Sequence, residues 1–168
     1  WLTLGFQQDN PHADLRGCGA LGLRQLLHFV RKCPRAVLPK AAESAFPLAA
    51  ASLNVTLALC THLRLLPTFA SSAPLAARPT QSHFLRLSME LEPASALDLM
   101  HAELLRGLAE LWSSMQRPGL TPMAFPEAMA LMNAHLAEAL AGCSPPWQLS
   151  EVLTRLRAVG SDDLSGQE

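Results

Sequence analysis

The sequence has few charged residues for its length and no excess of either sign. Asp, Glu, Lys and Arg make up 16% of its 168 residues, and the formal net charge is −1 at pH 7. A protein that binds nucleic acid needs a basic excess to neutralise phosphates, so we expect no nucleic-acid partner. No basic amphipathic stretch suggests binding to a membrane surface either.

Hydrophobic residues, at 49%, are abundant beside this small number of charges. The length suits one domain with its own core. The shortage of charge predicts exposed apolar surface, which either a partner or further sequence would cover. The chain starts at Trp1 with neither an initiator methionine nor a secretory signal peptide, so we expect a piece cut from a longer protein.

The cysteines are widely spaced, and no two of them lie at metal-ligand spacing. Because there is no C-x-x-C motif and no Cys/His cluster, we predict no metal site and no cofactor. A helical chain of this length does not need disulfides. We therefore expect free thiols in a reducing compartment, which favours a cytoplasmic location. The four positions are Cys18, Cys33, Cys60 and Cys143.

No segment alternates between apolar and polar residues as a strand does, and the pattern predicts an all-α fold. Residues 1–19 are rich in turn-forming residues and are predicted to be an irregular loop. Helical spacing of apolar residues, with proline and glycine at the breaks, predicts the helices that follow. Their approximate ranges are 20–32, 47–66, 81–91, 95–116, 126–141 and 150–159.

The same patterns predict buried faces and helix ends. In the helix at 20–32, we expect the core-facing residues to be Leu23, Leu26, Leu27 and Val30, and we expect His28 to be partly exposed. In the helix at 95–116, we expect an apolar stripe from Leu97 to Trp112 to be buried. Ser95, in a capping box with Asp98, and Ser150 are expected to cap their helices. Pro47 is expected to mark the start of one helix and Gly142 the end of another.

The second of these helices, at about 47–66, is predicted to be the central one. Residues 46–60 carry no charge, but fifteen residues are too few for a membrane span, and Ser52 and Thr56 interrupt the run. We expect five to six helices packed around this helix. We place one domain at 1–142, a C-terminal helix at 143–159 and a disordered tail at 160–168.

A glycine-rich pattern, G-x-G-x-x-G, runs from Gly17 to Gly22 and opens the first predicted helix. In dinucleotide-binding proteins this pattern follows a strand, and an acidic residue lies about 20 residues further on. Neither feature is present, and the P-loop pattern is absent as well. A nucleotide site is therefore not predicted.

A longer pattern around these glycines is far more specific. It reads W-x3-G-F-Q-x3-P-x2-D-x-R-G-x-G-x3-L-x2-L and starts at Trp1. It resembles the signature of the ELMO-domain (engulfment and cell motility) family at every fixed position. The sequence departs from the usual family pattern at Gln8, where glycine is usual, and at Asn10, where aspartate is usual. Weaker resemblance continues to about residue 142, although the family's domain also extends upstream of the tryptophan. The weaker matches are Phe46-Pro47, Asn54-Val55-Thr56, Leu111-Trp112 and Met123-Ala124-Phe125.

The resemblance implies a function. Long members of the family are scaffolds for Rac-type exchange factors and lack the arginine-glycine pair, whereas short members carry it and activate GTP hydrolysis by Arf and Arf-like GTPases. Arg16-Gly17 makes this chain similar to the short members. The chain would then be a GTPase activator with no reaction of its own. It would act in the cytoplasm, with recruitment to organelle membranes or the cytoskeleton by a partner.

The residues that this resemblance implies are Arg16 as the catalytic arginine finger, and Gln7, Pro11, Asp14, Gly17 and Gly19 as contacts with the GTP-bound partner. An arginine supplied in trans neutralises the charge that builds up during hydrolysis and accelerates it by about 10³–10⁵. Arginine suits the task because its charge is permanent and its planar fork contacts two oxygens.

Other interpretations of the same residues stay open. Arg16 could pair with Asp14 and only hold the loop, while the glycines serve backbone geometry and packing. Trp1 and Phe6 are predicted to plug the core beneath the loop. The whole chain could be a non-catalytic adaptor for a small GTPase or an exchange factor. It could also be a fragment with an incomplete fold.

Overall fold

The computed structural model describes most of the predicted helical regions. In this part of the chain every regular element is a helix, and no strand is present, so the all-α prediction is confirmed. The predicted tail at 160–168 lies outside the described residues. The described residues are 6, 9–10, 15, 17–32, 46–66, 79–91, 93–115 and 124–157.

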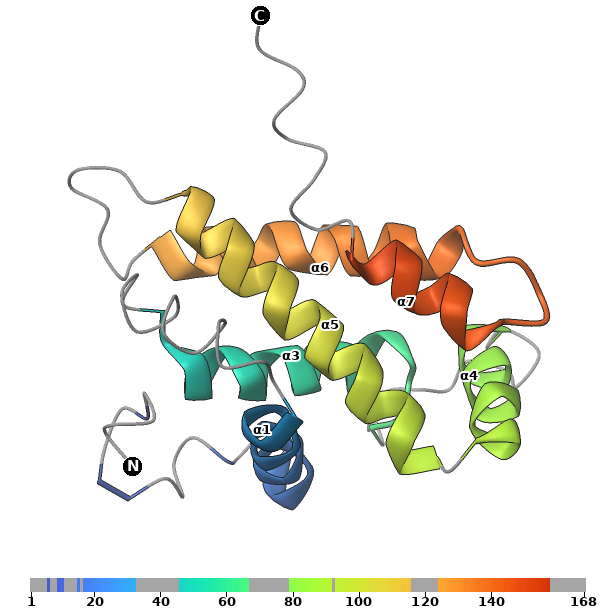
Figure 1. Ribbon diagram of the computed structural model, residues 1–168, viewed down its shortest axis with the longest axis horizontal. Coiled ribbons are helices and arrows are strands. Elements are labelled where there is room, and N and C mark those ends of the chain that lie inside the picture. The colour runs from blue at the N-terminus through green and yellow to red at the C-terminus, as the bar shows by residue number, and fades with distance from the viewer. Residues whose placement is uncertain are drawn as a thin grey trace, which may run out of the picture.

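Six helices make up the described part of the fold (Figure 1). The longest, α5, runs diagonally across the molecule, with α1 and α3 on one side and α6 and α7 on the other. It packs against all five of its neighbours, while α3 packs against α1, α5 and α6. The helices are α1 (Gly19–Lys32), α3 (Leu48–His62), α4 (Pro79–Glu90), α5 (Pro93–Ser114), α6 (Phe125–Ala141) and α7 (Leu149–Arg157).

Helix α3 is buried on nearly all sides, as its lack of charge predicts. Nine of its fifteen residues are buried. It ends at His62, four residues before the predicted end, because Arg64 adopts a left-handed conformation with φ of 55°. The backbone N–H of Leu65 then donates to the carbonyl of Cys60 at 2.8 Å, and that of Arg64 to Thr61 at 3.1 Å. This pair of bonds is the Schellman motif, with arginine where glycine is usual.

The apolar stripe predicted for α5 is confirmed, and the predicted starts of two helices are wrong. Helix α5 begins at Pro93, so Ser95 lies inside it and does not cap it; proline is well suited to a first helical turn. Helix α7 begins at Leu149, so Ser150 does not cap it either. The α5 residues of the stripe, all buried, are Leu97, Met100, Leu104, Leu108, Leu111 and Trp112.

The core has a large and a small part. The large part joins α3, α5, α6 and α7, and each fully buried leucine in it contributes roughly 2 kcal/mol. The small part lies between α1 and α3 and consists of Phe6, Leu26, Ala49 and Leu53. The prediction that Phe6 plugs the core is thus confirmed, while Trp1 lies outside the described residues.

Helix α1 turns a different face to the core from the one that apolar spacing predicts. Leu27 was expected inside and is 45% exposed, and Leu23 and Val30 are half-buried. The buried face carries Gly22, Gln25, Leu26 and Phe29. Gly22 and Gln25 are not apolar, so the spacing of apolar residues does not reveal them. It therefore predicts a buried face that is rotated by about one residue from the observed one.

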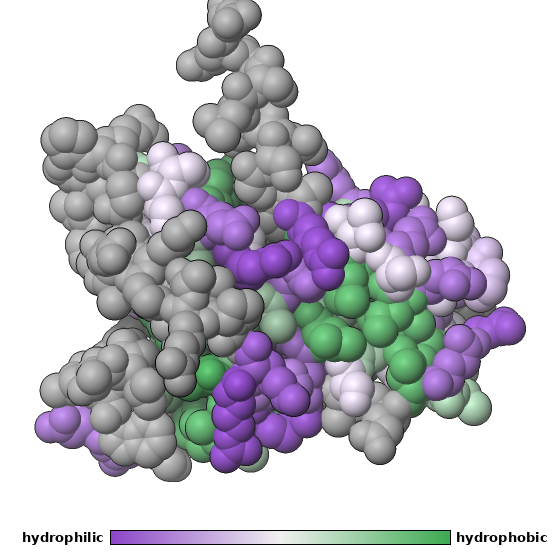
Figure 2. Space-filling view, in the orientation of Figure 1, coloured by the Kyte–Doolittle hydropathy of each residue, from purple (hydrophilic) through white to green (hydrophobic). Residues whose placement is uncertain are grey.

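Exposed apolar side chains are present, as the shortage of charge predicts. Figure 2 shows a hydrophobic area over the N-terminal half of α5, between α7 and α4. Within the described ranges, no helix is both long enough and apolar enough to cross a membrane. The large exposed apolar residues in the described part of the chain are Leu27, Leu85, Met89, Leu91, Leu99 and Leu131.

Candidate functional site

The segment that opens α1 is exposed and partly fixed by its glycines. Gly17 and Gly19 are both exposed. Gly19 has φ of +53°, a conformation that L side chains rarely adopt, and a Cβ there would meet no atom of the described residues within 4 Å. The backbone therefore favours glycine at 19, and no described residue fills the space outside it.

The remaining predicted site residues, namely Arg16, Gln7, Pro11 and Asp14, lie outside the described residues. The described neighbours of Arg16 are Leu15 and Gly17. Leu15 is half-buried against the small core cluster, and a Cβ on Gly17 would lie 3.4 Å from Cδ2 of Leu57 in α3. The chain on both sides of Arg16 is therefore seated on the surface that α1 and α3 form.

Gly22, the last glycine of the pattern, lets α1 approach α3 closely. A Cβ at this position would lie 2.4 Å from Sγ of Cys18 and 2.6 Å from Cδ2 of Leu53. The Cys18 thiol also donates to the carbonyl of Leu53 at 3.6 Å. Gly22 thus serves helix packing, which is one of the alternatives that the sequence left open.

We expect Gly22→Ala to lower the free energy of unfolding by about 1 kcal/mol, because the added methyl displaces the ends of the packed Cys18 and Leu53 side chains, and this outweighs the gain in helix propensity. Gly17→Ala is the matched control, since its methyl meets only ordinary contact and should change stability by about 0.5 kcal/mol or less. Urea unfolding followed by circular dichroism measures both. Equal stability of the two variants would contradict the close approach at Gly22.

A polar network beneath this segment holds α1 against α5. The Arg24 guanidinium donates to both carboxylate oxygens of Asp98, at 2.8 and 3.1 Å. The Asp98 side chain is only 6% exposed and that of Arg24 45%. Nδ1 of His28 lies 3.7 Å from the same carboxylate, and this histidine is partly exposed, as predicted. A bidentate pair of this kind fixes orientation as well as distance.

Gln25 extends the network to α3. Its amide nitrogen donates to the carbonyl of Leu97 at 3.3 Å, and its carbonyl accepts from the Thr56 hydroxyl at 2.7 Å. Gln25 and Thr56 are fully buried. Asn54, two residues before Thr56, is exposed and donates to the carbonyl of Ala50 at 2.8 Å, within its own helix. Thr56 therefore joins α3 to α1 inside the fold.

His101 of α5 is a further buried polar residue. Its Nε2 lies 3.1 Å from the carbonyl oxygen of Ser52 and 3.0 Å from the Ser52 hydroxyl. A carbonyl only accepts, so Nε2 carries the proton. Nδ1 is buried and has no hydrogen-bond partner among the described residues. Burial lowers the pKa of His101 to about 4, although the Ser52 hydrogen bond and Asp98 oppose this shift.

The His101 shift predicts that stability falls in mild acid. The unfolded chain takes up a proton at its ordinary pKa of about 6.5. The folded chain does not until about pH 4. The contribution of His101 to the free energy of unfolding is therefore fully present above about pH 6.5, and it is lost as the pH falls towards 4. The loss between pH 7 and pH 5 is about 2 kcal/mol. Unfolding by urea at a series of pH values measures it. His101→Gln should lose this part of the pH dependence, and an unchanged profile in that variant would contradict the assignment.

Sequence reasoning missed three of the buried polar residues, namely Gln25, Asp98 and His101. The position of Asp98 and His101 could have revealed two of them. They lie three residues apart within the apolar stripe of α5, where a polar side chain without a partner would destabilise the fold, so partners from other helices are expected. Interpreting Asp98 as a capping residue for Ser95 hid this signal. That interpretation is wrong because the carboxylate binds Arg24.

The described part of the chain holds no group of three His, Cys, Asp or Glu side chains that could bind a metal ion. Cys18, Cys60 and Cys143 are free thiols, and Cys33 lies outside the described residues. Burial raises the pKa of all three described thiols, so each is a poor nucleophile at neutral pH.

Comparison with known proteins bears on the same region. The ELMO/CED-12 family profile matches residues 1–129, from the glycine-rich segment through α5 to the start of α6. No curated protein and no solved structure matches the chain. The family match covers well over half of the 168 residues. The chain therefore belongs to the ELMO/CED-12 family, and this membership supports a part in signalling that involves small GTPases.

Proposed function

We propose that this chain activates GTP hydrolysis by an Arf or Arf-like GTPase and that Arg16 enters the partner's active site as an arginine finger. The observation that carries the proposal is the open space at Gly19, three residues after Arg16, within a complete R-G-x-G signature. Membership of the ELMO/CED-12 family supports the choice of a small GTPase as partner.

An arginine finger must reach phosphate groups that lie inside another protein's active site. Bulky side chains beside it would hold the two backbones apart. Gly17 and Gly19 are both exposed and add no such bulk, so the partner's backbone can approach the loop. Gln7, Pro11 and Asp14 are proposed to contact the partner or shape the loop on the same side.

The polar network beneath α1 supports the same proposal. Arg24 and Gln25 fix α1 to α5 and α3, and Leu15 packs on the small core cluster next to Arg16. Because these contacts fix the chain on either side of Arg16, the arginine loses less conformational entropy when it enters the partner's active site. In this proposal the chain performs no reaction of its own. It acts in the cytoplasm, where a partner recruits it to organelle membranes or the cytoskeleton.

Single-turnover GTP hydrolysis tests the proposal. A panel of purified Arf and Arf-like GTPases is loaded with GTP, and phosphate release is followed with increasing amounts of the chain. We expect at least one member to be accelerated, by up to about 10³–10⁵ at saturation. A Rac-type GTPase is the control and should show no acceleration. Binding to the GTP form without acceleration would favour the non-catalytic adaptor instead.

A further inference from the structure

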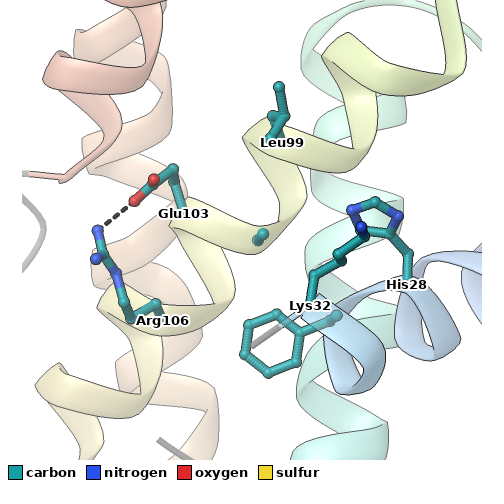
Figure 3. Close-up of a pocket in the computed structure, with 7 residues that line it drawn as sticks. His28, Lys32, Leu99, Glu103 and Arg106 are labelled. Carbon is teal, nitrogen blue, oxygen red and sulfur yellow. Dashed lines mark hydrogen bonds and ion pairs between the residues drawn. The ribbon is translucent and has the colours of Figure 1, made fainter. Parts of the chain in front are cut away.

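A pocket lies between the C-terminal half of α1 and the middle of α5, away from the glycine-rich segment (Figure 3). Its volume is about 480 Å³, within the range that ligand sites show. The distance along α1 from Gly19 to Lys32 is about 20 Å, so the pocket lies at the other end of this helix. Its lining residues are His28, Phe29, Lys32, Leu99, Ala102, Glu103 and Arg106.

The wall of the pocket is largely apolar. Phe29 and Ala102 contribute to it, and Leu99 is 40% exposed although it lies on α5, which packs against every other described helix. Phe29 is fixed from behind, because its ring packs edge-to-face against His101 with centroids 6.4 Å apart. The apolar wall is therefore preformed, and a small inorganic anion would leave it uncovered.

The rim of the pocket is positive. Figure 3 shows Lys32 and His28 on one side, and Glu103 and Arg106 on the other. Glu103 is already paired with two cations, Arg106 and Arg157. Within the described part of the chain Lys32 has no ion pair. Lys32 and Arg106 thus outnumber Glu103 among the charged residues that line the pocket, in a chain of net charge −1.

We propose that this pocket binds an acidic segment of a partner protein, one that inserts a large apolar side chain against Leu99 and Phe29 and places carboxylates beside Lys32 and Arg106. Charge complementarity selects an acidic segment, and the apolar wall selects one with an apolar anchor. Two flanking helices with an open groove between them suit the helix-in-groove mode of recognition. The proposal does not depend on the activity of Arg16, because the two sites lie at opposite ends of α1.

A library of random dodecapeptides displayed on phage, selected on the intact chain, tests this proposal. We expect the enriched sequences to carry Asp or Glu within four positions of a Leu, Phe or Met. The best sequence is then synthesised with a fluorescent label, and its affinity is measured by anisotropy. Lys32→Glu and Leu99→Ser should each weaken binding by roughly tenfold or more.

Two exposed residues of α4 supply the matched controls. Arg86→Glu reverses a charge, and Leu85→Ser removes an exposed leucine, both outside the pocket; each should leave the affinity within about twofold. No enrichment, enriched peptides without acidic residues, or affinity unaffected by Lys32→Glu and Leu99→Ser would each overturn the proposal. A further result would also overturn it: the chain binds vesicles that contain phosphatidylserine, this binding requires Lys32, and no peptide binds. The occupant of the pocket would then be a membrane.

Discussion

Arg16→Ala is expected to reduce the GTP hydrolysis that this chain stimulates by a factor of about 10³–10⁵, while the chain stays folded. The reason is that no other residue in the segment can carry a permanent positive charge to the γ-phosphate. Single-turnover phosphate release, at saturating amounts of the variant, measures the loss. Thermal unfolding of the same sample shows whether the fold is kept.

Arg16→Lys separates charge from shape at the same position. Lysine keeps the charge but lacks the planar fork that contacts two oxygens, so hydrolysis should fall nearly as far while binding to the GTP-bound partner persists. The structural alternative makes a different prediction. If Arg16 only paired with Asp14, then Arg16→Ala and Asp14→Ala would lower the melting temperature equally. Full stimulated hydrolysis by a folded Arg16→Ala chain would falsify the finger assignment.

Helix content and the main core were predictable from the sequence because each depends on local chemistry. Leucines at helical spacing in residues 95–116 predict the buried face of α5, and the structure confirms them. Pro47 and Gly142 correctly mark the start of α3 and the end of α6. These signals act within one or two helical turns, so a single sequence contains them in full.

The features that were missed depend on contacts between distant residues. Asp98 bonds with Arg24, which lies 74 positions earlier, so no local pattern around Ser95 could reveal that pairing. Likewise α3 ends at His62 because Arg64, just beyond it, takes a left-handed conformation that arginine rarely adopts. For the candidate site, family resemblance supplied Arg16, while the described geometry adds the open space at Gly19 and the supporting network under α1.

Loss of Arg24 should have the largest effect on stability among the substitutions considered. Arg24→Ala leaves the carboxylate of Asp98, only 6% exposed, without its bidentate partner. Removal of one partner of a buried pair costs roughly 3–5 kcal/mol, and we expect about 3 kcal/mol because water reaches the half-exposed Arg24 side. Urea unfolding measures this loss, and Arg31→Ala, on an exposed residue of the same helix, is the control with an effect within about 0.5 kcal/mol.

A double-mutant cycle shows whether the cost belongs to this pair. In the Arg24→Ala background, Asp98→Ala removes a carboxylate that already lacks its partner, so the second change should cost much less than it does alone. We expect a coupling free energy of about 2 kcal/mol between the two positions. Additive effects would mean that Asp98 stabilises the fold through Gln25 or His28 instead. Because Arg24 holds α1, Arg24→Ala should also weaken stimulated hydrolysis at temperatures where the chain is still folded. Arg16→Ala differs, because it removes activity and leaves stability unchanged.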